Sequence, residues 1–465
     1  MKKLRVITLG CSKNSVDTEH LLAALPEDAF SVVEDGPLDY LLYNTCGFIG
    51  DAKEESIQAV LEGAEAKKRG ETKELIVFGC LSQRYAAEMP GLIPEVDAWF
   101  GARDLTPILR YFGVPASRFT RRRQERRRGY AYLKVSEGCD RRCSYCAIPF
   151  IRGAHKSVPI EDLVEEATQL ASEGVSELIL IAQDTTFYGL DLYGKRCLAR
   201  LLEELSKVEG IERLRIHYSY PQDFPEDVLE QMANNPKVCK YLDIPLQHIS
   251  DQVLANMHRH IDAAGTRRII NALREKVPGV VLRTTMIVGH PGEGETEFRE
   301  LLDFVREARF ERLGAFMYSE EEGTWGAAHL EDSVTEEEKR RRLDDLMTLQ
   351  SEISLAFNRS RIGSVERVLV DGIVGDTLVC RSQYESPEVD GEILVPLPAA
   401  DWTPDQVGGD VPGRFSSVIA GGSSPVIAGG SFPVMPDTDR ASLIGRYLTV
   451  RITGAGEYDL TAEIA

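Results

Sequence analysis

Three closely spaced cysteines place the strongest constraint on how this chain can fold. Cys139, Cys143 and Cys146 occur in the segment EGCDRRCSYCAIP, directly after the apolar run YLKV, which has the composition of a buried strand. Three thiolates at this spacing can bind three irons of a [4Fe-4S] cluster and leave the fourth iron without a protein ligand. The open iron can bind a substrate. The fold must therefore present this loop to a space that a ligand can enter.

A structural zinc site is the main alternative for the same cysteines. Closed zinc sites generally use four Cys or His ligands, commonly in paired spacings, and no second pair follows here. His155 is the nearest further ligand candidate. We therefore expect an iron–sulfur cluster rather than zinc on the three cysteines.

The region that begins with these cysteines is expected to form a partial α/β barrel. Six β-rich runs alternate with helical patterns between residues 130 and 319: YLKVSEGC, ELILIAQD, RLRIHYS, YLDIPLQ, VLRTTMIVG and RLGAFMYS. Such alternation is typical of a parallel sheet, and barrels of this kind place their sites at the carboxyl ends of the strands. Gln183 and Asp184 end the second run and are candidate ligand contacts. Capping of a loop explains them equally well.

A second group of cysteines lies nearer the N-terminus. Cys11, Cys46 and Cys80 follow the ends of three apolar runs, LRVITLG, YLLYNT and ELIVFG. If these runs are parallel strands of one sheet, the three cysteines meet at one edge of it. Each could instead be a buried cysteine that acts as a small hydrophobic residue. Because the same position recurs three times, we expect a shared site for a soft metal.

The chain is expected to divide into four segments. These are an open parallel α/β sheet at 1–117, a basic linker at 118–129, the barrel with a trailing charged helix at 130–360, and a small antiparallel β-barrel at 361–465. The linker, RFTRRRQERRR, is expected to be exposed, with contact to a polyanion such as rRNA as the alternative. The near-repeat VIAGGSSP and VIAGGSFP at 418–433 is expected to be an insertion in a loop of the β-barrel.

Composition and charge restrict the location and the partners. Nine cysteines scattered through a long chain indicate reduced thiols and a cytoplasmic protein. No run approaches the roughly 18 apolar residues that cross a bilayer, so we expect no membrane partner. The net charge of −20 argues against broad binding to a nucleic-acid backbone and suits a basic protein partner. The same acidity can also serve solubility alone.

The spacing Cx3CxxC, with Tyr145 before the last cysteine, resembles the signature of the radical S-adenosylmethionine superfamily. Together with the N-terminal cysteines and the terminal β-barrel, it makes nearly the whole chain similar to the methylthiotransferase family. The resemblance implies S-adenosylmethionine on the open iron of the first cluster, with Tyr145 near its adenine. It also implies a low-potential electron donor such as flavodoxin or ferredoxin, and a terminal barrel of the TRAM type. The two [4Fe-4S] clusters that it implies would be held by Cys139, Cys143 and Cys146, and by Cys11, Cys46 and Cys80.

Four strings, YLKVSEGCDRRCSYCAIPFIRG, LILIAQDTTFYG, DIPLQHISD and RTTMIVGHPGE, resemble one branch of that family most, the RimO type. This branch adds a methylthio group to the β-carbon of an aspartate in the twelfth protein of the small ribosomal subunit. A basic ribosomal protein as substrate agrees with the acidity of this chain. His290 departs from the pattern, because an aromatic residue is expected at its position in many relatives.

Other functions remain as alternatives, one within the same family and the others outside it. The closer rival is the branch that methylthiolates isopentenylated adenosine in tRNA, which would make tRNA a partner. From a different class, the chain could be a non-catalytic iron–sulfur electron carrier or an RNA-binding module. A carrier does not need a barrel that leaves an iron open, and an RNA-binding module is expected to show a basic, aromatic-rich surface.

Overall fold

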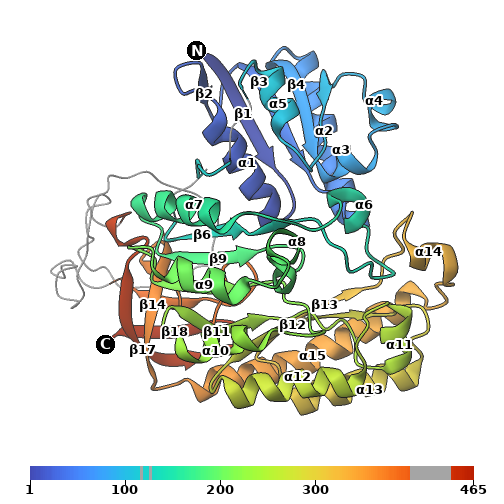
Figure 1. Cartoon of the computed structure of the whole chain (residues 1–465), viewed down its shortest axis with the longest axis vertical. Helices are drawn as coiled ribbons and strands as arrows, with labels where there is room; N and C mark the ends of the chain where they lie inside the picture. Colours follow the sequence, from blue (N-terminus) through green and yellow to red (C-terminus); the bar gives the residue numbers. More distant parts are fainter. Residues whose placement is uncertain (116–118, 125–127, 398–440) are drawn as a thin grey trace.

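The computed structural model describes residues 1–115, 119–124, 128–397 and 441–465, and they form three main sheets in the order of the chain (Figure 1). The expected fold class is confirmed: an open α/β sheet, a parallel barrel sheet and a small closed β-barrel. The repeat at 418–433 lies outside the described residues. Within the described ranges, no helix is both long enough and apolar enough to cross a membrane.

The first sheet is parallel, with the strand order β2-β1-β3-β4-β5. Its part of the chain contains β1 (Lys2–Thr8), α1 (Ser12–Ala24), β2 (Phe30–Val32), β3 (Leu38–Thr45), α2 (Gly50–Lys68), β4 (Thr72–Gly79), α3 (Cys80–Arg84), α4 (Met89–Leu92), β5 (Ala98–Trp99) and α5 (Thr106–Tyr111). The three runs that end at cysteines are β1, β3 and β4, which are neighbours in the sheet. β3 is buried at nearly every position, as expected for a parallel strand that is covered on both faces.

The second sheet has six parallel strands in the order β13-β12-β11-β10-β9-β6, and these are the six predicted runs. Its strands are β6 (Tyr130–Lys134), β9 (Glu177–Ile181), β10 (Arg213–Ile216), β11 (Val238–Asp243), β12 (Val281–Val288) and β13 (Arg312–Met317). A short antiparallel pair, β7 (Ser136–Glu137) and β8 (Lys156–Ser157), flanks the cysteine loop.

Helices connect these strands and cover the sheet. They are α6 (Ile148–Arg152), α7 (Ile160–Ser172), α8 (Leu190–Tyr193), α9 (Leu198–Ser206), α10 (Glu226–Asn234), α11 (Asp251–Asn256), α12 (Ala263–Lys276), α13 (Glu295–Ala308), α14 (Trp325–His329) and the long α15 (Glu336–Ser360). Thr335 precedes α15, and its side chain caps the helix by accepting a hydrogen bond from the amide of Glu338. The helix packs along β13, an edge strand of the six-stranded sheet.

The third sheet is a closed barrel in the order β14-β15-β16-β18-β17. Its strands are β14 (Val365–Val374), β15 (Thr377–Arg381), β16 (Ile393–Pro396), β17 (Tyr447–Ala455) and β18 (Leu460–Ile464). We expected antiparallel pairing throughout, but β16 and β18 are parallel. In a closed ring of five strands the direction cannot alternate at every pair, because alternation requires an even number.

The prediction that the whole basic run at 118–129 is exposed was wrong. Arg122 is buried, and it pairs with Glu19 of α1 and with Glu166 of α7, the latter at 2.9 Å. Its neighbour Arg121 is exposed. The charge pattern could not separate the two arginines, because the carboxylates that bury Arg122 come from helices far away in the sequence.

A buried ion network joins the barrel sheet to the terminal β-barrel. The carboxylate of Glu177, at the start of β9, accepts hydrogen bonds from Arg215 of β10 at 2.8 Å and from Arg381 of β15 at 3.3 Å. All three side chains are buried. Burial alone would raise the pKa of Glu177, but the guanidinium groups of Arg381 and Arg215 lower it to about 2.

Glu177→Gln is expected to lower the free energy of unfolding at pH 7 by about 3 kcal/mol or more, because two buried guanidinium groups lose their carboxylate. The contribution of Glu177 is fully present above its ordinary pKa of 4.5 and is lost as the pH falls toward 2. The deficit should therefore be smaller at pH 3 than at pH 7 in urea unfolding. Glu212→Gln, which removes an exposed partner of Arg367, is the matched control and should change little. A deficit of equal size at both pH values would contradict this account.

Candidate cofactor sites

The N-terminal cysteines stand just beyond the carboxyl ends of three adjacent strands. Cys11 follows β1 and occupies the N-cap position of α1 without a side-chain capping bond, Cys46 follows β3, and Cys80 is the first residue of α3 after β4. The three thiols interact: burial first, and then Cys11 and Cys46, raise the pKa of Cys80 to about 11 against the opposing effect of Arg152. The structure therefore brings the three cysteines to one edge of the sheet. That they bind a cluster stays a prediction.

Glycines allow the ends of β3 and β4 to approach each other. A Cβ atom on Gly47 would lie 2.8 Å from the backbone of Leu81. A Cβ atom on Gly79, which has a φ of +106°, would lie 2.5 Å from the carbonyl oxygen of Thr45. Any larger residue would push these strand ends apart, together with the cysteines that follow them. The close backbone approach therefore helps to set the spacing of the thiols.

The second group of cysteines lies in the loop between β7 and α6, at the carboxyl end of β6. Cys139, Cys143 and Cys146 are partly buried. Burial, and after it Cys143 and Cys139, raises the pKa of the Cys146 thiol, so these thiols are mutual neighbours. The amide of Cys139 donates to the carbonyl of Gly153, and the amide of Ser144 donates to that of Met257, both at 3.0 Å. The backbone of the loop is thus fixed at both ends.

The fit of these thiols to a cluster depends on their number and placement. No three His, Cys, Asp or Glu side chains in the described part of the chain lie close enough to share a single metal ion. A [4Fe-4S] cluster makes a different demand, because each thiolate binds its own iron. Three convergent thiols are the donor set of a cluster with one open iron. Burial raises the pKa of several of them, so cluster binding must displace their protons.

Orphaned polar atoms surround the loop of Cys139. Gln183 Oε1, Arg141 Nη2 and His290 Nε2 are buried and have no hydrogen-bond partner among the described residues. Unpaired buried polar groups are costly, so such atoms indicate a polar ligand. S-adenosylmethionine, with its amino acid, ribose and adenine groups, is a ligand of that kind. These residues therefore fit the cofactor that the resemblance implies.

Asp184 and Gln183 have different roles in the structure. Asp184 caps the short helix η1 (Thr185–Phe187) by accepting from the amide of Thr186 at 2.9 Å, and it pairs with Arg141 at 2.7 Å. The loop-capping alternative therefore describes Asp184. Gln183 donates to Glu137 at 3.0 Å and keeps its carbonyl oxygen free of described partners. Contact of either residue with S-adenosylmethionine stays a prediction.

Tyr145 lies in an aromatic group next to the cysteines. Its ring centroid is 6.2 Å from that of His290, which lies 4.9 Å from that of Tyr318. Burial lowers the pKa of His290 to about 4, so its ring is neutral at pH 7. His290 therefore packs between the two tyrosines as an aromatic ring would. This explains how the departure from the expected pattern at this position can be accommodated.

Arg152, at the end of α6, connects the two groups of cysteines. Its buried guanidinium donates to Cys80 Sγ at 3.3 Å, to Asn14 Oδ1 at 2.5 Å and to Asp17 Oδ2 at 2.8 Å. All three acceptors belong to the first sheet domain, whereas Arg152 follows Cys146 in the barrel. Sequence reasoning missed this residue. Its only signal is its position in PFIRG, just after the cysteine loop.

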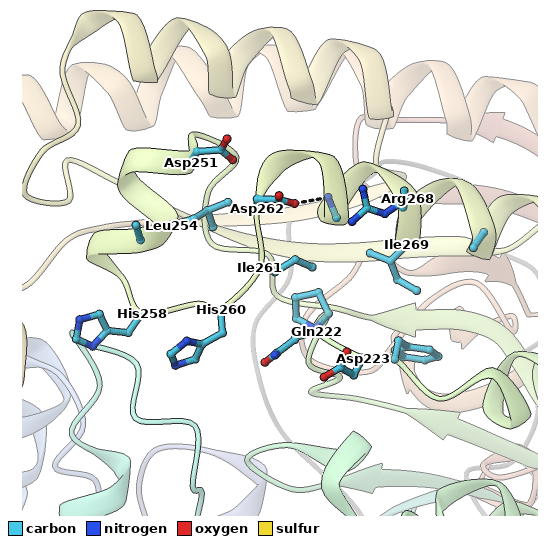
Figure 2. Close-up of a pocket in the computed structure, with 15 residues that line it drawn as sticks. Gln222, Asp223, Asp251, Leu254, His258, His260, Ile261, Asp262, Arg268 and Ile269 are labelled. Carbon is cyan, nitrogen blue, oxygen red and sulfur yellow. Dashed lines mark hydrogen bonds between the residues drawn. The ribbon is translucent and has the colours of Figure 1, made fainter.

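A cavity of about 850 Å³ lies between the segment after β10 and the segment of α11 and α12 (Figure 2). Residues of the segments 221–224 and 251–272 line it, among them Gln222, His260 and Asp262. The predicted site residues are not part of its wall in the described structure. Gln222 connects the cavity to the loop by accepting a hydrogen bond from Arg141 at 3.2 Å.

Comparisons with known proteins place this arrangement in a family. Residues 3–101 match the uncharacterized protein family UPF0004, residues 133–305 the radical SAM superfamily and residues 362–418 the TRAM domain. A ribosomal protein uS12 methylthiotransferase RimO from Porphyromonas gingivalis is 50% identical over 400 residues, which cover 85% of this chain and 92% of that protein. The chain belongs to the RimO family.

Other RimO proteins agree with this assignment, and one solved structure has a similar fold. Those of Bacteroides fragilis and Flavobacterium johnsoniae are both 48% identical over 399 residues, covering 85% and 84% of this chain and 92% and 91% of the relatives. The radical S-adenosylmethionine methyltransferase TsrM from Kitasatospora setae has a TM-score of 0.53 at 15% identity, covering 68% of this chain and 75% of that chain, and shows likeness of fold alone. The predicted family, the RimO branch of the radical SAM methylthiotransferases, is confirmed. Membership implies iron–sulfur and S-adenosylmethionine chemistry.

Gly47→Ala is expected to lower the free energy of unfolding by about 1–3 kcal/mol, because the new Cβ would meet the backbone beside Cys80. Gly50→Ala is the matched control: it lies in the first turn of α2, and its Cβ would meet nothing within 4 Å. Urea unfolding of the metal-free protein measures both variants. Equal stability of the two variants would show that the close approach of the strand ends is not required.

Proposed function

We propose that this chain is a radical S-adenosylmethionine enzyme that adds a methylthio group to the β-carbon of an aspartate in ribosomal protein uS12. The observation that carries the proposal is the pair of cysteine groups, each at the strand ends of its own parallel sheet. Arg152, in the helix that follows the second group, makes a buried contact with Cys80 of the first. Such an arrangement suits a reaction that needs a radical source and a sulfur source near one substrate atom. The names of the RimO relatives support the substrate.

Two [4Fe-4S] clusters are assigned to the two groups of cysteines. When bound, the clusters and S-adenosylmethionine would supply a 5'-deoxyadenosyl radical and the sulfur that replaces the substrate hydrogen. Tyr145 would lie beside the adenine, and Gln183 would offer its free carbonyl oxygen to the cofactor. The reductive cluster would be held by Cys139, Cys143 and Cys146, and the sulfur-carrying cluster by Cys11, Cys46 and Cys80.

Two arginines hold the loop of the proposed reductive cluster in place. Arg141 pairs with Asp184 at 2.7 Å and lies over the ring of Tyr220 at 3.9 Å. Arg259 approaches Cys143 Sγ at 3.6 Å and also contacts Tyr220 from 4.2 Å. Their charges face the thiols and compensate part of the negative charge of a thiolate-bound cluster. A cluster held there would thus be oriented by these side chains and shielded from water by them on one side.

The remaining segments are assigned to binding of partners. In this proposal residues 1–117 carry the second cluster, 118–129 connect, 130–360 carry the radical site, and 361–465 anchor uS12. A low-potential donor such as flavodoxin or ferredoxin would reduce the clusters. The net charge of −20 supports association with a basic ribosomal protein.

The proposed function is tested by anaerobic reconstitution, followed by reductant, sulfide, S-adenosylmethionine and a uS12 peptide that contains the target aspartate. We expect 5'-deoxyadenosine and a peptide that gains the mass of one SCH2 unit, read by mass spectrometry. Transfer to tRNA instead of the peptide would show that the tRNA branch is the right one. Absence of 5'-deoxyadenosine would contradict the radical chemistry itself.

Cysteine variants separate the two clusters. Cys80→Ala should still form 5'-deoxyadenosine but not the methylthio product, whereas Cys139→Ala should form neither. In both variants the iron content should fall from about eight to about four per chain. Cys197→Ala is the matched control, because Cys197 is buried and belongs to neither group of cysteines. A Cys80→Ala variant with full iron content would remove Cys80 from the ligand set.

A further inference from the structure

Lys13 is a buried lysine to which the described residues offer no anionic partner. It lies two residues after Cys11, and 8% of its surface is exposed. Within the described residues, no carboxylate lies within 4.0 Å of its ammonium, and no hydrogen-bond acceptor is in reach. The ammonium stands 3.3 Å from the ring centroid of Tyr218. Buried lysines are almost always paired, so this one requires an explanation.

The acidic groups close to Lys13 already have other partners. Asp17, one turn further along α1, pairs with Lys134 and with Arg152, the latter at 2.8 Å. Asp243, which binds the backbone of Tyr218, pairs with its own arginine, Arg283, at 2.8 Å. Lys13 also lies in the first turn of α1, where the helix dipole adds positive potential. In the part of the chain that the structure describes, the positive charge at this point is therefore not balanced by a carboxylate.

Tyr218 fixes the ammonium at the carboxyl edge of the barrel sheet. Its φ of +57° is unusual for an aromatic residue, and such strain persists only where the surroundings impose it. The amide of Tyr218 donates to Asp243 Oδ2, and its carbonyl accepts from the amide of Thr185, both at 3.0 Å. Thr185 follows Asp184, which pairs with Arg141 of the second cysteine loop. The backbone of Lys13 thus lies beside the first group of cysteines. Its ammonium lies at the carboxyl edge of the barrel sheet, the same edge at which the second group of cysteines is found.

We propose that the ammonium of Lys13 binds the side-chain carboxylate of the target aspartate. The inference rests on the proposed function and deepens it. The carboxylate is bonded to the β-carbon that loses a hydrogen, so an ion pair there positions the reacting atom between the two sources of chemistry. The ring of Tyr218 covers one side of the ammonium and leaves other N–H donors for a ligand. The single positive charge of Lys13 can be neutralised by the one carboxylate of an aspartate. The adenine base of a tRNA substrate carries no negative charge at the carbon that would react.

The test combines a change in the enzyme with a change in the peptide. Peptides with Asp or Asn at the target position are titrated onto the cluster-loaded protein without reductant, with fluorescence anisotropy as the readout. The wild type should bind the Asp peptide about 10- to 100-fold more tightly than the Asn peptide. Lys13→Met should abolish this preference, and Lys13→Arg should retain part of it. Lys73→Met, which removes an exposed lysine of the same domain, should leave the preference unchanged.

A second set of measurements separates the possible sources of the carboxylate. Binding of S-adenosylmethionine, iron content and the electron paramagnetic resonance spectra of Lys13→Met should match those of the wild type. Weaker binding of S-adenosylmethionine together with an unchanged Asp preference would overturn the inference, because Lys13 would then bind the cofactor carboxylate. If the wild type modifies the Asp peptide and Lys13→Met keeps the preference, Lys13 is not the anchor, although the proposed function stands. If the wild type leaves the peptide unmodified, the proposed function itself fails.

Discussion

The position of the two cysteine groups relative to each other depends on the contacts that the buried guanidinium of Arg152 makes. It binds Cys80, Asn14 and Asp17 in one domain while its own backbone belongs to the segment that follows Cys146 in the other. Removal of this charge would leave Asp17 with less than its full set of partners in a buried position, which is costly. The contact therefore ties the edge of one sheet to the cysteine loop of the next.

The molecule as a whole is acidic, but it also holds a buried positive charge. The net charge of −20 favours the approach of a basic partner, whereas Lys13, buried beside the ring of Tyr218, has no counterion among the described residues. An acidic residue presented by a basic protein meets both conditions. Long-range attraction would bring the partner, and the local cation would select the residue to be modified. The acidic surface and the ammonium of Lys13 would thus both contribute to recognition of the same substrate.

The sequence was sufficient for features that local pattern determines. Nine apolar runs became strands of the two parallel sheets, and because parallel strands share a direction, cysteines at their ends had to gather at an edge. The roles of Arg122, Arg152 and Lys13 could not be predicted, since each depends on partners, or on their absence, at distant positions. The parallel pair β16 and β18 was missed because closure of the barrel, rather than either strand, imposes its direction.

Iron anomalous diffraction from anaerobically grown crystals of the reconstituted protein tests the central claim most directly. Two separate groups of iron atoms should appear between the sheets. One should contact Cys11, Cys46 and Cys80, and the other should contact Cys139, Cys143 and Cys146. Iron at a single group of cysteines, or iron bound at Cys197, Cys239 or Cys380, would contradict the two-cluster account.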